Sequence, residues 1–323
     1  MKEAENVMAL IDVVVTGITQ ETPTVKSIQL SRLDGTPIGK YAPGAHIDVV
    51  GPTAVTRQYS LCSRPDAEDS FVVAVKREEH SRGGSAALHE LKVGDTLKIS
   101  EPRNLLHIAP DAAHHILIAA GIGITPMLSM ARYMDVHGIG FDLHYFARTE
   151  QDAAFLPLLR DRCPHKLHAH LGVSRDQHDK ILETALQAAP AHSHVYVCGP
   201  DGFMSNAVAL AGRFVPSAAV HFEKFHAGDQ PDASTNRPFD VELDGRTYPV
   251  PADKTIVAVL EENGCDVDTS CQEGICGTCI MQVLAGVPEH RDNVLTESER
   301  NSGELIAVCV SRANSQRLVL DYY

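Results

Sequence analysis

The chain has 323 residues, which is enough for two or three domains that each bury a hydrophobic core. Its composition, with 44% hydrophobic and 22% charged residues, is ordinary for a globular protein. The net charge of −14 argues against nucleic-acid binding, because nucleic-acid phosphates would repel an acidic protein. The sequence has no apolar run near the roughly 18 residues of a membrane span, and its acidic N-terminus is unlike a signal peptide. These features predict a cytoplasmic protein without a membrane segment.

Residues 10–108 carry short β-strand patterns separated by turns. The clearest patterns cover residues 11–15, 25–30, 71–75 and 96–99, and Asp34-Gly35 marks a turn between two of them. No helical period of similar strength appears in this segment. The segment therefore predicts a small antiparallel β-barrel.

Two motifs in this segment indicate chemistry. Arg57-Gln-Tyr59-Ser60 lies in a strand-like stretch, and Arg82-Gly83-Gly84-Ser85 precedes a short helical pattern. Glycines that open a helix beside a hydroxyl leave N–H groups free to bind a phosphate. Each motif alone is weak, because both occur by chance in many strands and turns. Together, in this order and at this spacing, they resemble the flavin-binding barrel of the ferredoxin-reductase superfamily.

This resemblance implies a role for each motif residue. Arg57, Arg82 and the turn of Gly83, Gly84 and Ser85 would hold the flavin phosphate. Tyr59 would lie against the flavin ring and Ser60 near flavin N5, although Tyr59 is also compatible with a plain half-buried strand aromatic. The backbone of Ala74, Val75 and Lys76 would line the pyrimidine edge of the flavin.

A second region begins with the apolar residues 115–120, which suit a buried parallel strand. The strand leads into the turn Gly121-Ile-Gly123-Ile-Thr125-Pro126. Thr125 as N-cap and Pro126 as first helical residue predict a helix that continues through residue 133. Glycines at a strand-to-helix turn let a pyrophosphate approach the backbone, although the third glycine of the Rossmann fingerprint is missing.

Strand and helix patterns alternate from there to Cys198, which predicts a doubly wound parallel sheet. The expected strands cover residues 141–146, 166–171 and 194–198, and the expected helices cover 153–162 and 180–189. Cys198-Gly199-Pro200 then ends a strand at the carboxyl edge of the sheet, where ligands bind. Cys198 is also compatible with a small buried hydrophobe. Combined with the Gly121 turn, it resembles the nicotinamide-side C-G-P motif of the same superfamily.

Further residues complete the predicted nucleotide and flavin sites. In the family resembled, an aromatic residue at the position of Phe225 covers the flavin face, with Glu223 as a polar neighbour; a core Phe is the alternative. Ser60, Cys198 and Phe225 would then be the catalytic residues. Asp152 suits the adenosine ribose of NADH, whereas Arg148 in the same loop suits the 2′-phosphate of NADPH, so NADPH is the less favoured nucleotide.

The last region contains the most specific pattern of the chain. Cys271, Cys276 and Cys279 are separated by four and two residues, and Cys309 follows after 29 more, which is the ligand spacing of a plant-type [2Fe-2S] cluster. Glycines stand between these ligands, where a Cβ would obstruct the close approach of the backbone. The alternatives are a zinc site, which usually has two C-x2-C pairs, and inert buried thiols.

The elements around the cysteines also have an order. Residues 226–238 are polar and rich in Pro, Gly and Ser, and they predict a linker at 229–238. Residues 239–250 alternate around Asp244-Gly245, which predicts a β-hairpin. Residues 255–263 predict an amphipathic helix ended by Gly264, and the cysteine loop follows. Hairpin, helix and cysteine loop follow the order of the β-grasp ferredoxin fold.

Over its whole length the chain resembles the phthalate dioxygenase reductase family, with the vanillate demethylase reductases as close relatives. The resemblance implies a multidomain fold of α/β and β type: an antiparallel β-barrel flavin domain (1–108), a doubly wound parallel-sheet NAD domain (109–228), a linker (229–238) and a β-grasp ferredoxin domain (239–323). Its implied activity is to take a hydride from NADH onto FMN and pass single electrons through the [2Fe-2S] cluster to a Rieske-type oxygenase. The alternatives are a carnitine-type or non-Rieske acceptor, and a metal-binding interaction module without turnover.

Charge is concentrated in the ferredoxin-like part. Residues 239–323 contain 15 Asp and Glu against 6 Lys and Arg, so −9 of the −14 lies there. One interpretation is a solvated surface that keeps the domain soluble. The other is a docking face for a basic patch on the terminal oxygenase, with the reductase itself a monomer.

Overall fold

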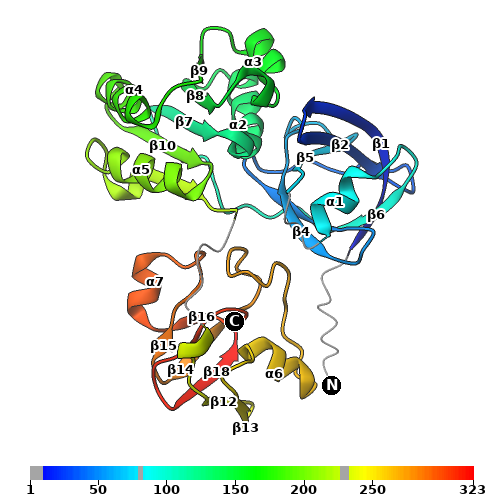
Figure 1. Ribbon diagram of the computed structural model, residues 1–323, viewed down its shortest axis with the longest axis vertical. Helices are drawn as coiled ribbons and strands as arrows, with labels where there is room; N and C mark the ends of the chain where they lie inside the picture. Colours follow the sequence, from blue (N-terminus) through cyan, green and yellow to red (C-terminus); the bar gives the residue numbers. More distant parts are fainter. Residues whose placement is uncertain (1–9, 79–82, 226–232) are drawn as a thin grey trace. The chain divides into compact units, whose positions relative to one another are not determined.

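The computed structural model describes residues 10–78, 83–225 and 233–323 (Figure 1). These residues divide into two compact units. The first unit ends at Glu223 and contains a six-stranded sheet and a five-stranded sheet, and the second unit starts at Lys224 and contains another five-stranded sheet. No helix in the described ranges is long and apolar enough to cross a membrane. Arg82 and the first part of the expected linker at 229–238 lie outside the described residues.

The six-stranded sheet is antiparallel and has the strand order β4-β3-β6-β1-β2-β5. A bridge between Leu61, just after β4, and Val73 on β5 joins the two edges, so the sheet closes on itself and the predicted barrel is confirmed. Its elements are β1 Ile11–Thr22, β2 Val25–Arg32, β3 His46–Val50, β4 Thr56–Ser60, β5 Phe71–Lys76, β6 Thr96–Ile99 and the helix α1 Gly84–His89.

The strand β3 was not predicted because its sequence mixes polar and apolar residues, and its first four residues are all buried. Asp48 is only 2% exposed and accepts a 2.6 Å hydrogen bond from Arg103. His46, equally buried, faces the functional site described below. A strand that buries polar side chains does not show the alternation that identifies strands in a sequence.

The second sheet of the first unit is entirely parallel, with the order β11-β10-β7-β8-β9. Successive strands run outward from β7 in both directions, which confirms the doubly wound sheet and places the change of direction between β7 and β10. Figure 1 shows α4 and α5 on one side of this sheet and α2 and α3 on the other. The elements are β7 His114–Ala120, η1 Gly121–Gly123, α2 Ile124–Val136, β8 Phe141–Ala147, η2 Glu150–Asp152, α3 Leu156–Arg162, β9 Leu167–Leu171, α4 Arg175–Ala188, β10 Ser193–Cys198, α5 Asp201–Ala211, η3 Ser217–Ala219 and β11 Val220–Glu223.

The start of α2 differs from the prediction. A single 3₁₀ turn, η1, follows β7 and continues directly into the helix, so Gly123 is the N-cap and Thr125 is already helical. The Thr125 hydroxyl donates to the Ile122 carbonyl at 3.0 Å instead of capping the helix. The predicted N-cap at Thr125 and first position at Pro126 are therefore wrong, because the glycines allow the helix to start earlier.

The sheet of the second unit has the order β13-β12-β18-β14-β16, with β12 and β18 parallel. The helix α6 packs its apolar side chains into the core on this sheet, which gives the expected β-grasp arrangement. Thr255 caps α6 through the Ala258 N–H, and Asp244 and Gly245 turn the hairpin with φ of 53° and 71°. The elements are η4 Ala233–Thr235, β12 Phe239–Leu243, β13 Arg246–Val250, α6 Ile256–Glu262, β14 Ile280–Ala285, β15 Pro288–Glu289, α7 Glu297–Ser302, β16 Leu305–Ala307, β17 Arg312–Ala313 and β18 Arg317–Tyr322.

Candidate functional site

The predicted phosphate-binding residues lie next to each other in the barrel. A Cβ added to Gly84, at the start of α1, would lie 3.4 Å from Cγ of Arg57 on β4. Gly83 has a φ of +102°, which favours glycine at this turn. The Ser85 hydroxyl accepts a hydrogen bond from the Glu78 N–H at 3.2 Å and so stabilises the loop itself. The structure thus brings Arg57 and the glycine turn together, and their phosphate role stays a prediction.

The predicted ring-binding residues lie on β4 and β5. Tyr59 is half-buried against the barrel core, and this burial raises the pKa of its hydroxyl to about 12, so the ring stays neutral. Ala74 and Val75 are buried, whereas Lys76 is exposed and pairs with Glu78. The Val75 carbonyl already accepts a 2.8 Å hydrogen bond from His89. Of the backbone groups expected at the pyrimidine edge, this carbonyl is therefore engaged within the barrel.

A cluster of buried polar side chains connects the barrel to the parallel sheet. Ser60 on β4 is the cross-strand partner of His46 on β3. His46 Nδ1 lies 3.5 Å from the Glu223 carboxylate at the end of β11, and the Cys198 thiol donates to the Glu223 carbonyl at 3.4 Å. The structure therefore gathers the predicted Ser60, Cys198 and Glu223, together with His46, which the sequence analysis missed.

Several atoms of this cluster have no hydrogen-bond partner among the described residues. They are Ser60 Oγ, both ring nitrogens of His46, Glu223 Oε2 and the neighbouring Gln58 Nε2. Buried polar atoms without partners are costly, so such a group indicates a place where a polar ligand supplies them. A flavin ring edge, which carries N–H, N and C=O groups, fits this set of donors and acceptors.

The two glycine turns expected at the nucleotide meet at the carboxyl ends of β7 and β10. A Cβ on Gly123 would lie 2.3 Å from the Cys198 carbonyl oxygen and 2.6 Å from the Gly199 nitrogen, so these backbones touch only because residue 123 is glycine. Pro200 then precedes α5 as its N-cap residue. The turns lie where the strand order changes direction, which is where α/β sheets bind nucleotides.

Cys198 is fully buried in this arrangement. Burial, and secondly the nearby Glu223 carboxylate, raise the pKa of its thiol well above the usual range. The thiol is therefore neutral and a poor nucleophile. Its role at the nicotinamide stays a prediction.

Three further predicted residues lie outside the polar cluster. Asp152 is exposed in η2 after β8 and accepts a 2.8 Å hydrogen bond from the Thr149 hydroxyl, and Arg148 is exposed in the same loop. This places both candidates for the nucleotide ribose at the carboxyl edge of the sheet. Phe225 is half-buried and belongs to the second unit, and its role as a flavin lid stays a prediction.

The four expected iron ligands, Cys271, Cys276, Cys279 and Cys309, are all buried in the second unit. Their thiols form two contacting pairs, Cys271 with Cys276 and Cys279 with Cys309. The hydrogen bond from the Cys271 thiol lowers the pKa of Cys276 to about 5, and the one from Cys309 lowers the pKa of Cys279. Within the described residues no three His, Cys, Asp or Glu side chains are arranged around a single metal ion. Two pairs of thiols suit two irons that each take two thiolates.

The loop around these thiols depends on its backbone. The N–H groups of Glu273 and Thr278 donate to the sulfurs of Cys271 and Cys276 at 3.3 and 3.5 Å. Gly274 and Gly277 have φ of +72° and +77°. A Cβ on Gly274 would lie 2.5 Å from a Val310 methyl carbon and 3.1 Å from Asp292 Cα. The prediction that these positions require glycine is confirmed.

Comparisons with known proteins agree with an iron-sulfur site in the second unit and with an oxidoreductase over the whole chain. Residues 239–314 match the family described as a 2Fe-2S iron-sulfur cluster binding domain, and residues 97–218 match the dimethylamine monooxygenase subunit DmmA-like N-terminal domain. The chain is 37% identical to the vanillate O-demethylase oxidoreductase of Acinetobacter baylyi, over 97% of this chain and 99% of that protein.

Several solved structures match nearly the whole chain, and two of them are informative here. An intact type IV self-sufficient cytochrome P450 monooxygenase has a TM-score of 0.84 at 34% identity and covers 99% of this chain, which spans only 43% of that longer protein. Phthalate dioxygenase reductase, described as a modular structure for electron transfer from pyridine nucleotides to [2Fe-2S], has a TM-score of 0.74 at 34% identity and covers 97% of this chain and 98% of its own. The chain therefore belongs to the phthalate dioxygenase reductase family of flavin- and [2Fe-2S]-containing oxidoreductases, together with the vanillate O-demethylase oxidoreductases.

Proposed function

We propose that this chain is the NADH-dependent reductase of a Rieske-type aromatic-ring oxygenase or demethylase. In this proposal residues 1–108 bind FMN, residues 109–228 bind NADH, residues 229–238 are a linker and residues 239–323 hold the cluster. The observation that carries the proposal is the cluster of unpartnered polar atoms around Ser60 and Glu223, next to Cys198 at the carboxyl edge of the parallel sheet. The two thiol pairs of the second unit add the one-electron centre that an oxygenase reductase needs.

The chain's own residues bind and orient the reactants. Arg57 and the glycine turn hold the flavin phosphate, and Tyr59 lies against the ring. Ser60 Oγ and Glu223 Oε2 offer hydrogen bonds to the flavin edge and the nicotinamide amide, and the turns of Gly123 and Cys198 support the nucleotide. When bound, the flavin accepts two electrons as a hydride and releases them singly, which matches NADH to one-electron acceptors. The protein contributes mainly positioning, because hydride transfer requires close, aligned reacting atoms.

In the second unit the cysteine loop holds the cluster and controls its charge. Each sulfur that accepts a backbone N–H is stabilised in its anionic state. The N–H groups of Glu273 and Thr278 therefore favour thiolate at Cys271 and Cys276. The same hydrogen bonds would stabilise negative charge on a bound cluster.

The acidic surface beside the cysteine loop is the proposed docking face for the oxygenase. Glu261, Glu262, Asp266 and Asp268 are exposed between α6 and the first iron ligand, and no Lys or Arg occurs from residue 255 to residue 290. Glu262 pairs with Lys254 at 2.6 Å, and the other three carboxylates have no ion-pair partner within the described residues. Such a surface attracts a Lys/Arg patch and speeds association at low salt.

A charge-reversal experiment tests this docking face. Asp266→Lys with Asp268→Lys should slow oxygenase reduction about tenfold or more at low salt, and salt should affect the wild type more than the variant. The matched control is Glu304→Lys with Asp321→Lys, which changes net charge equally at other exposed positions of the second unit. Stopped-flow with purified oxygenase measures the rate of oxygenase reduction and its dependence on salt for both double variants. An equal effect of the two double variants would leave the acidic face only a solubility role.

A second acceptor class has its own support. The match to the self-sufficient P450 monooxygenase has a higher TM-score than the match to phthalate dioxygenase reductase, 0.84 against 0.74. A haem monooxygenase is therefore the second candidate partner. Turnover of the purified reductase with a Rieske oxygenase and with a P450 in parallel distinguishes the two, because only the true acceptor couples NADH oxidation to product.

We also propose that the protein acts as a cytoplasmic monomer. None of the eight cysteines, all within the described residues, is in a disulfide, which suits a reducing compartment. Both proposed centres come from one chain, so catalysis needs no second copy. Light scattering of the holoprotein at working concentration tests the monomer, and a dimer mass would contradict it.

A further inference from the structure

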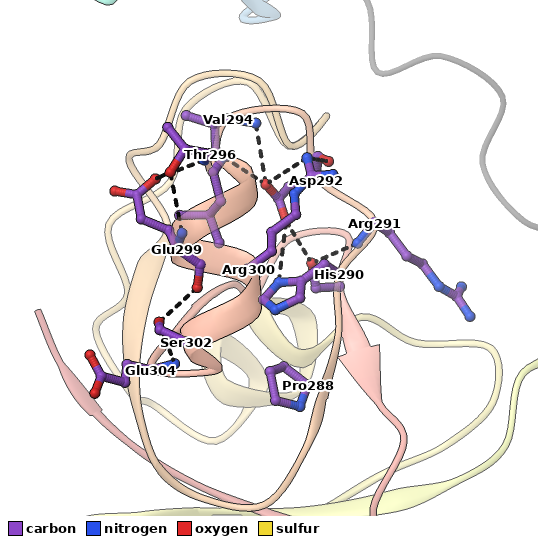
Figure 2. A network of polar contacts seen from close by, with 12 residues as sticks. Pro288, His290, Arg291, Asp292, Val294, Thr296, Glu299, Arg300, Ser302 and Glu304 are labelled. Carbon is purple, nitrogen blue, oxygen red and sulfur yellow. Dashed lines mark hydrogen bonds and ion pairs between the residues drawn. The ribbon is translucent and has the colours of Figure 1, made fainter. Parts of the chain in front are cut away.

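A buried carboxylate, Asp292, lies at the centre of a network of polar contacts with residues 290–300 (Figure 2). Its side chain is 0% exposed, and its Oδ2 accepts the N–H groups of Val294 and Leu295 at 3.2 and 2.9 Å. Its Cα lies 3.1 Å from the position of a Cβ on Gly274, inside the cysteine loop. The carboxylate is therefore packed against the loop that carries three of the four thiols.

Asp292 also links the loop to the segment of the fourth thiol. The Ser311 hydroxyl, two residues after Cys309, donates to Asp292 Oδ1 at 3.4 Å and accepts the Arg291 N–H at 3.1 Å. Asn293, the residue after Asp292, donates its N–H to the Gly274 carbonyl at 2.8 Å. Both thiol-bearing segments are thus hydrogen-bonded to residues 291–293.

The counter-charge comes from α7. Thr296 and Glu299 form a capping box that fixes the start of this short helix. From its last turn Arg300 reaches back, so that Nη2 lies 3.6 Å from Asp292 Oδ2 and also donates to the Asp292 carbonyl, as Figure 2 shows. His290 Nδ1 lies 3.7 Å from Asp292 Oδ1. The anion is therefore flanked by one permanent cation and one imidazole.

A buried ion pair is weak support for stability, since a well-packed apolar replacement is often as stable. Its value here is geometric and electrostatic. We infer that Asp292 is a positioning residue of the iron-sulfur centre, because it joins the two thiol-bearing segments. We also infer that Arg300 sets the reduction potential of the cluster by neutralising the charge of Asp292. This inference rests on the proposed function of the second unit as the cluster domain.

The charge balance predicts the direction in which the reduction potential of the cluster shifts. Removing the Arg300 charge leaves an uncompensated anion beneath the cluster, which disfavours the extra electron of the reduced state. The reduction potential should therefore fall. Lysine at the same position restores the charge without the planar guanidinium and should restore most of the potential.

The experiment is a redox titration of the purified holoprotein with mediators, followed by the visible and EPR signals of the cluster, without NADH or oxygenase. Arg300→Met should lower the reduced-to-oxidised ratio at fixed potential about tenfold, equivalent to about 59 mV for a one-electron couple. Arg300→Lys should stay near the wild type. Arg317→Met is the control, because Arg317 pairs with Glu242 and Thr247 on the β12–β13 hairpin. A shift in Arg300→Met no larger than in Arg317→Met would overturn the electrostatic half of the inference.

Chelator-driven loss of the cluster tests the positioning half. Ser311→Ala removes the hydroxyl between Asp292 and the Cys309 segment, and should speed cluster loss about tenfold. Ser302→Ala is the control, because the Ser302 hydroxyl at the end of α7 donates to the Glu299 carbonyl and accepts the Glu304 N–H, and so bonds neither Asp292 nor the Cys309 segment. Equal loss rates for the two variants would overturn this half. Neither measurement needs nucleotide or oxygenase, so either failure leaves the proposed function standing.

Discussion

Replacing Gly274 with alanine tests how the fold builds the cluster loop. The residue has a φ of +72°, in the left-handed region that costs an L-residue about 1–2 kcal/mol. The new Cβ would lie 2.5 Å from a Val310 methyl carbon and 3.1 Å from Asp292 Cα. The methyl group can turn away, but the Asp292 backbone is fixed by its network, so overpacking adds about 1–3 kcal/mol. The variant should be destabilised by about 2–5 kcal/mol in the cluster-bound second unit.

Gly264→Ala is the matched control. Gly264 follows α6 with a φ of +77°, but a Cβ there meets no atom within 4 Å. This variant should therefore be destabilised only by the left-handed conformation, by about 1–2 kcal/mol. The difference between the two variants isolates the close packing around Gly274.

The assay is urea unfolding of the full chain, followed by the visible circular dichroism of the cluster, with iron content per chain as a second readout. We expect Gly274→Ala to lose the signal at lower urea than Gly264→Ala and to purify with less iron. Equal midpoints and equal iron content would refute the claim that residue 274 contacts the Asp292 segment closely.

Three further predictions concern the flavin, the cluster and pH. Arg57→Ala should weaken FMN binding by about 10- to 150-fold, because a charged phosphate contact is worth roughly 1.5–3 kcal/mol. Arg64→Ala, which removes a surface pair with Asp66, is the control and should not weaken it. Flavin content after dialysis measures both variants. Cys276→Ser should keep NADH-driven flavin bleaching and stop reduction of cytochrome c or oxygenase, and full-rate reduction would contradict the electron order. Burial lowers the pKa of His144 on β8 from 6.5 to about 4, so between these two pH values the unfolded chain binds more protons than the folded one. The free energy of unfolding should therefore fall as pH drops from 6.5 to 4, by up to about 3 kcal/mol. Thermal unfolding of wild type and His144→Gln from pH 7 to 4 measures the last effect, and parallel curves would contradict it.

The parts of the fold that the sequence predicts well depend on local interactions. The Asp244-Gly245 hairpin, the α6 helix and the cysteine loop all lie where predicted, because a turn, a helical period and a ligand spacing are each set by neighbouring residues. The parallel sheet was recognised from its short apolar strands. The helix α5 was not predicted, because it starts with Asp201-Gly202 directly after Gly199-Pro200, which is typical of a turn.

The missed part of the site depends on strand pairing. His46 becomes a neighbour of Ser60 only through the β3–β4 register, and of Glu223 only through the packing of β11 against the barrel. Neither relation appears in the spacing of residues along the chain. The sequence therefore predicts the motif residues of the flavin site and omits a partner that only the fold brings to it.

The central claim is that electrons pass from NADH through flavin to the cluster within one chain. The most direct measurement is anaerobic stopped-flow of the holoprotein with one equivalent of NADH, in which flavin and cluster absorbance are followed separately. The account predicts that flavin bleaching comes first and that cluster reduction follows it, without any oxygenase present. Cluster reduction that precedes flavin bleaching, or that occurs at an unchanged rate in flavin-depleted protein, would contradict the account.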